Sequence, residues 1–176
     1  KLAGKEKTMK KNWVAFSMIL ALSMAGSIAA GPLAEKAKIF DEDIQKLNCP
    51  NGLIFDVILD SNGNFAKVAG DGDSCIWSGA YLAAQSFRFM TTKDPQALKN
   101  IEKTLRAFHT LQKVTGCPGF LGRSFGEPQI YQDPPSKKTG VGSYSHLLFN
   151  CDTSRDQYTG LFLGYTLAWP LISDPE

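Results

Sequence analysis

The residues best suited to chemistry lie in the stretch CDTSRDQYTGLFLGY, from Cys151 to Tyr165. A positioned carboxylate can accept or donate a proton, and Asp156 is the residue for which we predict a carboxylate role. Part of the stretch has a structural explanation, because Ser154 and Gln157 have the S-x-x-Q spacing of a helix capping box. Asp156 would then lie in the first helical turn, where negative charge is favourable without any catalytic role. Both interpretations stay open.

A second copy of this pattern stands earlier in the chain, where WSGAYLA (Trp77–Ala83) matches YTGLFLG (Tyr158–Gly164) in residue type. Asp73 and Ser154 each precede the central glycine by the same interval, and both are good N-cap residues. The repeat predicts two helices of one kind, in repeated helical hairpins. Neither the cap nor the repeat requires Asp156, because the first copy has no carboxylate at that position.

Two helices are predicted around the first copy. Apolar residues recur at helical spacing from Asp73 onward, and Asp73 or Ser74 can cap the start of that helix. Asp94-Pro95 begins a second helix, with aspartate as N-cap and proline at the first helical position, and Gly116 ends it. The short break between the helices predicts an antiparallel hairpin. The buried stripe of the second helix is expected to be Leu98, Ile101, Leu105, Phe108, Leu111 and Val114.

A short helix and a β-hairpin are predicted before these helices. The helix covers Ala34–Leu47, which is charged but carries apolar residues at helical spacing. Two β-prone runs, Leu53–Leu59 and Asn64–Ala69, flank Asn62-Gly63, a strong signal for a hairpin turn. The motif DSNGN also imitates the first ligands of a calcium loop, but Phe65 occupies the position that must be glycine. We therefore prefer the hairpin.

The segment Pro118–Tyr144 is predicted to be a long loop, because it is rich in glycine and proline. Long irregular loops in compact domains are usually either functional or disordered. We expect an ordered loop, since it contains the aromatic and apolar residues Phe120, Leu121, Phe125, Ile130 and Tyr131.

The N-terminal region has the pattern of a secretory signal peptide that begins at Met9, with residues 1–8 as an upstream extension. Two lysines follow Met9, then an apolar segment, Trp13–Met24, and an A-x-A-like cleavage site at Ser27-Ile28-Ala29. An uncleaved N-terminal anchor is the alternative. We expect an exported protein, periplasmic or extracellular, without a membrane span after cleavage, because no later apolar run is long enough.

The net charge supports the same assignment. Residues 1–30 hold five lysines and one glutamate, so removing them changes the formal net charge from +2 to −2. The basic character therefore belongs to the leader, and a nucleic-acid partner loses its electrostatic basis. Residues 31–176 are the mature part on this interpretation.

Four cysteines permit two disulfides in an exported chain, and sequence leaves the connectivity open. In the hairpin arrangement Cys75 and Cys117 lie at the same end of two antiparallel helices, which favours a Cys75–Cys117 bridge and leaves Cys49–Cys151. Four ordinary thiols are the alternative. No C-x-x-C pair is present, so we predict no metal site.

Three segments carry a resemblance to a known superfamily: GDSCIWSGAYLAAQSFRFMTTKDP, TGCPGFLGRSF and CDTSRDQYTGLFLGYTLAW. They resemble exported bacterial proteins of the six-hairpin glycosidase-like, (α/α)-toroid type. The resemblance implies a mainly α fold of antiparallel helical hairpins, together with the short β-hairpin. It also implies that residues 31–176 are the N-terminal part of a toroid domain that is incomplete at the C-terminus. Asp174-Pro175 would then begin the second helix of a further hairpin, as Asp94-Pro95 does in the first.

The resemblance implies a carbohydrate-active protein, a glycoside hydrolase or polysaccharide lyase that acts on a poly- or oligosaccharide and needs no cofactor. It implies that Asp156 and Asp73 act as catalytic carboxylates, although Asp73 is equally well explained as a helix cap. The implied substrate-binding residues are Trp77, Tyr81, Arg123, Asp152 and Tyr158. Aromatic rings would stack on sugar faces, or lie in the core, and Arg123 would pair with a uronate carboxylate or with loop groups. The fragment alone is expected to be inactive.

The alternative from another functional class is a non-catalytic envelope protein whose helical toroid binds a glycan or a protein partner. No serine-hydrolase elbow, phosphate-binding loop, dinucleotide fingerprint or zinc-protease motif is present. His109 lies beside the apolar stripe of the second helix, and His146 has no second ligand at metal spacing.

Overall fold

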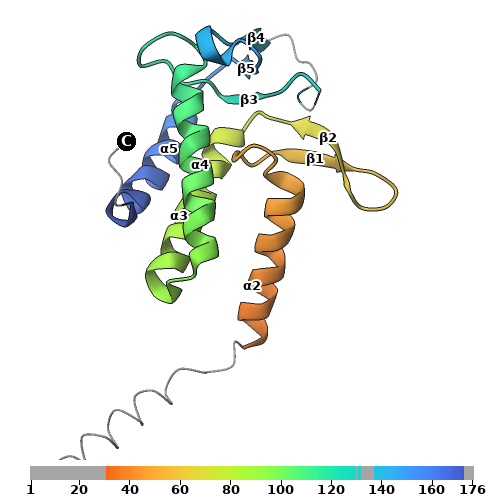
Figure 1. The fold of residues 1–176 in the computed structure, drawn as a ribbon, viewed down its shortest axis with the longest axis vertical. Helices are drawn as coiled ribbons and strands as arrows, with labels where there is room; N and C mark the ends of the chain where they lie inside the picture. Colours follow the sequence, from red (N-terminus) through yellow and green to blue (C-terminus); the bar gives the residue numbers. More distant parts are fainter. Residues whose placement is uncertain (1–30, 130, 132–136, 173–176) are drawn as a thin grey trace, which may run out of the picture. The chain divides into compact units, whose positions relative to one another are not determined.

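The structure is a computed structural model that describes residues 31–129, 131 and 137–172. Within these residues the chain forms four α-helices and two small antiparallel sheets (Figure 1). This is a mixed α/β small domain. The helices expected in the mainly α prediction are present, but the second sheet was not predicted. The described residues form no toroid. The predicted signal peptide, Ile130 and the Asp174-Pro175 helix start lie outside the described residues. No described helix has the length and apolar character needed to cross a membrane.

The first described helix, α2 (Pro32–Asp43), continues into a π-helical turn, η1 (Ile44–Asn48). These elements confirm the helix predicted over Ala34–Leu47. Its apolar residues Ile39 and Phe40 are 51% and 56% exposed, and α2 contains no buried residue. The charged composition of α2 therefore matches a helix in contact with solvent along its length.

A β-hairpin follows, formed by β1 (Asp56–Leu59) and β2 (Phe65–Gly70) in antiparallel pairing. The Asp60 carboxylate accepts hydrogen bonds from the backbone N–H groups of Asn62, at 2.8 Å, and Asn64, at 2.9 Å. These bonds hold the pKa of Asp60 below its ordinary value. Gly63 has φ 77°, which the turn requires. The predicted hairpin is confirmed, and Asp60 serves the turn.

The two predicted central helices are α3 (Ser74–Thr92) and α4 (Pro95–Lys113), which form the expected antiparallel hairpin (Figure 1). The Asp94 side chain accepts a hydrogen bond from the Gln96 amide at 2.8 Å, so this predicted N-cap is confirmed. At the other end of α4, Gly116 adopts φ 67° and leads the chain out of the helix. The apolar stripe of α4 is buried at Ile101, Phe108, Leu111 and Val114 and partly buried at Leu98 and Leu105.

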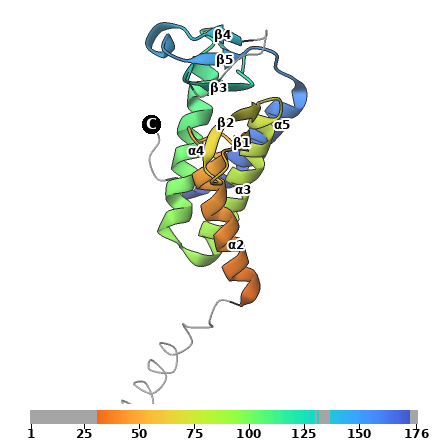
Figure 2. The same cartoon turned by 90° about the vertical axis from the view of Figure 1, so that its right-hand side faces the viewer.

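The last helix, α5 (Arg155–Ala168), runs beside α3 in the same direction (Figures 1 and 2). The two central glycines of the repeat bring their backbones together: a Cβ on Gly79 would lie 1.9 Å from the Gly160 carbonyl oxygen. A Cβ on Gly160 would lie 2.4 Å from the Cα atom of Ile76, and one on Gly164 would lie 2.8 Å from the Leu82 side chain. The repeated glycines are therefore explained by the close contact between the two helices that carry them.

The segment predicted as a long loop contains two strands. β3 (Ser124–Gly126) and β4 (Lys137–Thr139) pair antiparallel with either side of β5 (Leu148–Asn150), giving the order β3-β5-β4. Strands of three residues are too short to show a period of two, so the sequence pattern gives no strand signal. The expectation of ordered apolar residues is confirmed at Phe125 and Tyr131, which are buried. Two 3₁₀ turns, η2 (Gly142–Tyr144) and η3 (Trp169–Leu171), complete the described elements.

All four cysteines are thiols in the structure, so the favoured bridges Cys75–Cys117 and Cys49–Cys151 are wrong. Cys75 is fully buried and directs its Sγ to the Gln157 carbonyl oxygen of α5 at 3.4 Å, whereas Cys117 lies exposed in the turn after α4. Burial raises the pKa of Cys75 to about 12, so this thiol is inert at neutral pH.

Candidate functional site

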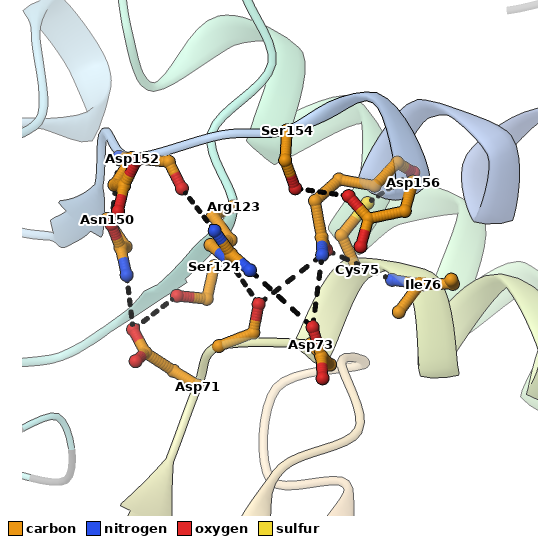
Figure 3. Close-up of polar contacts among 12 residues, drawn as sticks. Asp71, Asp73, Cys75, Ile76, Arg123, Ser124, Asn150, Asp152, Ser154 and Asp156 are labelled. Carbon is orange, nitrogen blue, oxygen red and sulfur yellow. Dashed lines mark hydrogen bonds and ion pairs between the residues drawn. The ribbon is translucent and has the colours of Figure 1, made fainter.

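The candidate site lies where α3 and α5 begin, next to the start of β3 and the segment that follows β5 (Figure 3). Four of the predicted site residues come together there: Asp73, Arg123, Asp152 and Asp156. They come from three segments of the chain, because Asp152 and Asp156 lie only four positions apart, so the site is a product of tertiary structure.

Arg123 holds these segments together. Its Nε donates to the Gly72 carbonyl oxygen, its Nη1 to the Asp152 carbonyl oxygen at 2.8 Å, and its Nη2 contacts the Asp73 carboxylate at 3.5 Å. The side chain is only 18% exposed. The guanidinium is therefore engaged with the protein itself, as in the alternative interpretation of this residue, and the structure does not present it for pairing with a uronate.

Asp73 is at the N-cap position of α3 but makes no capping hydrogen bond with its side chain. Its carboxylate is 54% exposed and contacts Arg123 Nη2 and Gln157 Nε2, each at 3.5 Å. The prediction that Asp73 or Ser74 caps α3 is thus wrong for the Asp73 side chain. The Ser74 hydroxyl is buried, and no hydrogen-bond partner for it is found among the described residues.

The cap of α3 comes from Gln157, on α5. Gln157 is fully buried, and its Oε1 accepts a hydrogen bond from the Ile76 amide at 3.2 Å, the third amide of α3. Its Nε2 donates to the Gly72 carbonyl oxygen at 3.3 Å. A side chain from one helix thereby satisfies a free amide at the start of another, and Asp73 is left available for other contacts.

The predicted capping box of α5 is also wrong, because both of its side chains bond to other groups. Ser154 occupies the N-cap position, but its side chain makes no capping bond and instead donates to the Asp156 carboxylate. Gln157, the other member of the box, is turned toward α3. Residue types at the right spacing were present, but tertiary contacts competed successfully for both side chains.

Asp156 is fully exposed in the first turn of α5. The Ser154 hydroxyl is the main cause that lowers the pKa of Asp156, with smaller contributions from backbone N–H groups and the Arg123 guanidinium, against a small opposing effect of desolvation. The carboxylate is therefore anionic across the neutral range. It is suited to accept a proton or a hydrogen bond, and poorly suited to donate a proton.

The three predicted aromatic residues lie in different surroundings. Trp77 is 56% exposed on α3, one turn after Asp73, and is available for stacking. Tyr158 is half-buried, and its hydroxyl accepts from the Leu121 amide at 3.0 Å and donates to the Gly119 carbonyl at 3.2 Å, so it holds the segment after α4. Tyr81 is buried, and its hydroxyl accepts from Gln45 at 2.9 Å and Asn100 at 3.1 Å. The predicted binding role of Tyr81 is not supported by its position.

A buried polar cluster beside the site was missed. The Asp71 carboxylate accepts hydrogen bonds from Ser124 Oγ at 2.7 Å and from Asn150 Nδ2 at 3.2 Å (Figure 3). It also accepts one from the Tyr131 hydroxyl. Burial would raise the pKa of Asp71, but the hydrogen bonds together hold it below its ordinary value. Burial, together with the Asp71 carboxylate, raises the pKa of Tyr131. No sequence signal joins Asp71 to residues 53 to 79 positions later.

Among the residues that the structure describes, no group of three histidine, cysteine or acidic side chains is placed to hold a metal ion. His109 and His146 are both exposed and belong to different segments, on α4 and between η2 and β5.

Comparison of the chain with protein-family models, with curated proteins and with solved structures gives no significant match. The resemblance to toroid proteins therefore stays a prediction that depends on the three sequence motifs alone. What the structure adds is the arrangement of the side chains that those motifs contain.

Proposed function

We propose that the chain is part of an exported carbohydrate-active protein, and that the end where α3 and α5 begin contacts a poly- or oligosaccharide. The observation that carries the proposal is that two exposed carboxylates, Asp73 and Asp156, both interact with Arg123 at the end where α3 and α5 begin, and that the exposed Trp77 follows one turn after Asp73. Carboxylates next to an aromatic ring can bind a sugar through its hydroxyl groups and its apolar face.

The toroid assignment belongs to this proposal. It is supported by the parallel contact between α3 and α5, which are the two members of the sequence repeat, and by the antiparallel return of α4. Repeated helical hairpins place equivalent helices side by side in this way. The starts of the equivalent helices then lie at one end, where Asp73 and Asp156 are found.

Hydrolysis fits the site better than elimination. Lyases of uronate polymers need a group that neutralises the substrate carboxylate, and Arg123 is engaged with Gly72, Asp152 and Asp73. In hydrolysis with inversion, Asp156 would accept a proton from water while the water oxygen attacks the anomeric carbon. The glycosidic C–O bond breaks, and a second carboxyl group protonates the leaving oxygen. Asp73 is the candidate for that second group.

A second candidate is a non-catalytic envelope protein that binds a glycan or a protein partner. It is favoured by the large apolar side chains exposed along α3 and α5, namely Trp77, Phe87, Phe162 and Leu163. Apolar side chains gathered on neighbouring helices are typical of surfaces that contact a partner.

The test is to express the complete gene product and measure released sugars across a panel of neutral and acidic polysaccharides. Asp156→Asn should lower sugar release at least about a hundredfold. The control is Asp56→Asn, which makes the same change at an exposed position on β1 and should leave release unaltered. Release undiminished by Asp156→Asn would remove the catalytic assignment. Binding without turnover on every polysaccharide would favour the second candidate.

A further inference from the structure

A cavity of about 440 Å³ lies in the part of the molecule where the β1–β2 hairpin, the end of α4 and the β3–β5–β4 sheet meet. This volume falls in the range of small-molecule sites. The cavity does not use Asp73, Arg123 or Asp156, so it is separate from the proposed carbohydrate site. The lining residues that decide its chemistry are Phe55, Phe125, Tyr131, Tyr144, Glu127 and His146.

The walls of the cavity are aromatic and fixed. Phe55 and Tyr131 pack edge to face, with ring centroids 6.2 Å apart, and both are nearly fully buried. Asn51 holds the wall in place, because its Nδ2 donates to the Phe125 carbonyl at 2.6 Å and its Oδ1 accepts from the Leu53 amide at 3.1 Å. A cavity whose walls are held by the core is formed before any ligand arrives.

The aromatic rings attract cations. The Lys137 ammonium lies 3.5 Å from the centroid of the Tyr131 ring, which shows that this ring already holds a positive charge of the chain itself. The attraction arises from the negative face of the aromatic quadrupole and becomes stronger where water is excluded.

Among the described residues of the lining, Glu127 is the acidic one, and it is exposed. These lining residues include no lysine or arginine, although the Lys137 ammonium lies against the Tyr131 ring from outside the lining. The other titratable groups nearby are the imidazole of His146 in the lining, and Asp71 and Lys137, which both contact Tyr131. A ligand carboxylate or phosphate would therefore meet aromatic rings and Glu127, and Lys137, the nearby cation, is already engaged with the Tyr131 ring.

We propose that this cavity binds a small organic ammonium ion, with the cation beside the aromatic walls and Glu127 as its counter-ion. This combination of aromatic rings and a carboxylate is the chemistry that recognises alkylammonium groups. The assignment does not depend on the carbohydrate proposal, because it uses different residues.

The test compares two probes of equal shape on the full chain: choline, and its uncharged isostere 3,3-dimethylbutan-1-ol. Calorimetric titration at pH 8 should give choline at least about fivefold tighter binding than the neutral alcohol. Glu127→Gln, an isosteric change at an exposed position, should weaken choline about fivefold and leave the neutral alcohol unaltered.

The matched control is Glu102→Gln, which removes a carboxylate from α4 outside the cavity lining and should alter neither titration. Circular dichroism of each variant confirms that the fold is kept. Absence of choline binding, or equal binding of the two probes, would overturn the proposal. Choline binding that is insensitive to Glu127→Gln would equally overturn it, because the counter-ion would then be elsewhere.

Discussion

The N-termini of α3 and α4 are capped in two different ways. At α4 the cap is local: Asp94 accepts a hydrogen bond from the amide of Gln96, two residues later, at 2.8 Å. At α3 an aspartate also stands at the N-cap position, but the Ile76 amide is bonded by Gln157, 81 positions further along the chain. The aspartate side chain therefore caps the helix at α4, whereas at α3 the Asp73 side chain makes no capping hydrogen bond. Asp73, an exposed carboxylate that is not needed for capping, is a better candidate for a functional role than Asp94.

The largest expected effect concerns the contact that brings Gln157 to α3. A Cβ on Gly79 would lie 1.9 Å from the Gly160 carbonyl oxygen, so Gly79→Ala must push α5 away from α3. We expect the free energy of unfolding to fall by about 3 kcal/mol or more, measured by urea denaturation. Ala80→Ser is the control, because Ala80 is exposed on the same helix, and it should cost about 0.5 kcal/mol or less.

The same measurement on a double variant tests whether α5 supplies the cap of α3. If α5 carries the cap of α3, the effects of Gly79→Ala and Gln157→Leu are not independent, and the double variant should lose less than the sum of the two. Strict additivity, or a Gly79→Ala variant as stable as the parent protein, would show that the two helices are not joined through this contact.

Gln157→Leu is expected to have the next largest effect. It leaves the Ile76 amide and the Gly72 carbonyl without the partners that Gln157 supplies, inside a contact where the side chain is fully buried. We expect a loss of about 2 to 3 kcal/mol in the free energy of unfolding. Gln157→Glu distinguishes the cap from packing, because it keeps the size and the accepting oxygen. It should restore part of the loss at acidic pH, where its carboxyl group is protonated and can again donate. If Gln157→Glu restores the loss equally at all pH values, packing of the side chain dominates.

The difference between the two caps also explains what the sequence could predict. Asp94-Pro95, the β-hairpin about Asn62-Gly63 and the helices were predicted because their signals are local and their residues lie within a few positions of each other. The capping box at Ser154 was wrong because the competing partner of Gln157 belongs to another helix. Local preference is a weak prior wherever a tertiary contact offers the same side chain a buried partner.

In the candidate site, too, some residues could be predicted from the sequence and others could not. Asp156 was singled out because neither the cap nor the repeat requires it, and Asp73 because of the resemblance. The structure brings both to one end of the helix pair, near Arg123. Asp71 was missed because its partners come from the short strands β3 and β5 and from Tyr131, which show no periodic pattern. The resemblance implied a binding role for Tyr81, but the hydroxyl of this buried residue accepts hydrogen bonds from Gln45 and Asn100.

The Asp71 cluster gives a smaller effect that depends on pH. Its pKa in the folded chain is below the ordinary value of 3.8, so its stabilising contribution is complete above that value and is lost as pH falls through the folded pKa. At neutral pH Asp71→Asn should lower the free energy of unfolding by about 1 to 2 kcal/mol. The gap between parent and variant should narrow as the pH falls below about 4.

Urea denaturation at a series of pH values measures this gap directly. Asp56→Asn, at an exposed position on the neighbouring strand β1, is the matched control and should change stability little. A gap that stays constant down to the acid limit would mean that the Asp71 carboxylate is not held in its charged form by Ser124, Tyr131 and Asn150.

The smallest effects compare the two aspartates at the helix starts. Asp94→Ala removes a local cap and the contact to Arg88 at 2.6 Å, so we expect a loss of about 1 kcal/mol. Asp73→Ala removes no capping bond and only two contacts at 3.5 Å, so stability should change by about 0.5 kcal/mol or less. Saccharide binding should show the opposite order, impaired by Asp73→Ala and unaffected by Asp94→Ala. Equal losses of stability would mean that Asp73 caps α3 after all, and its exposure would then be no argument for a functional role.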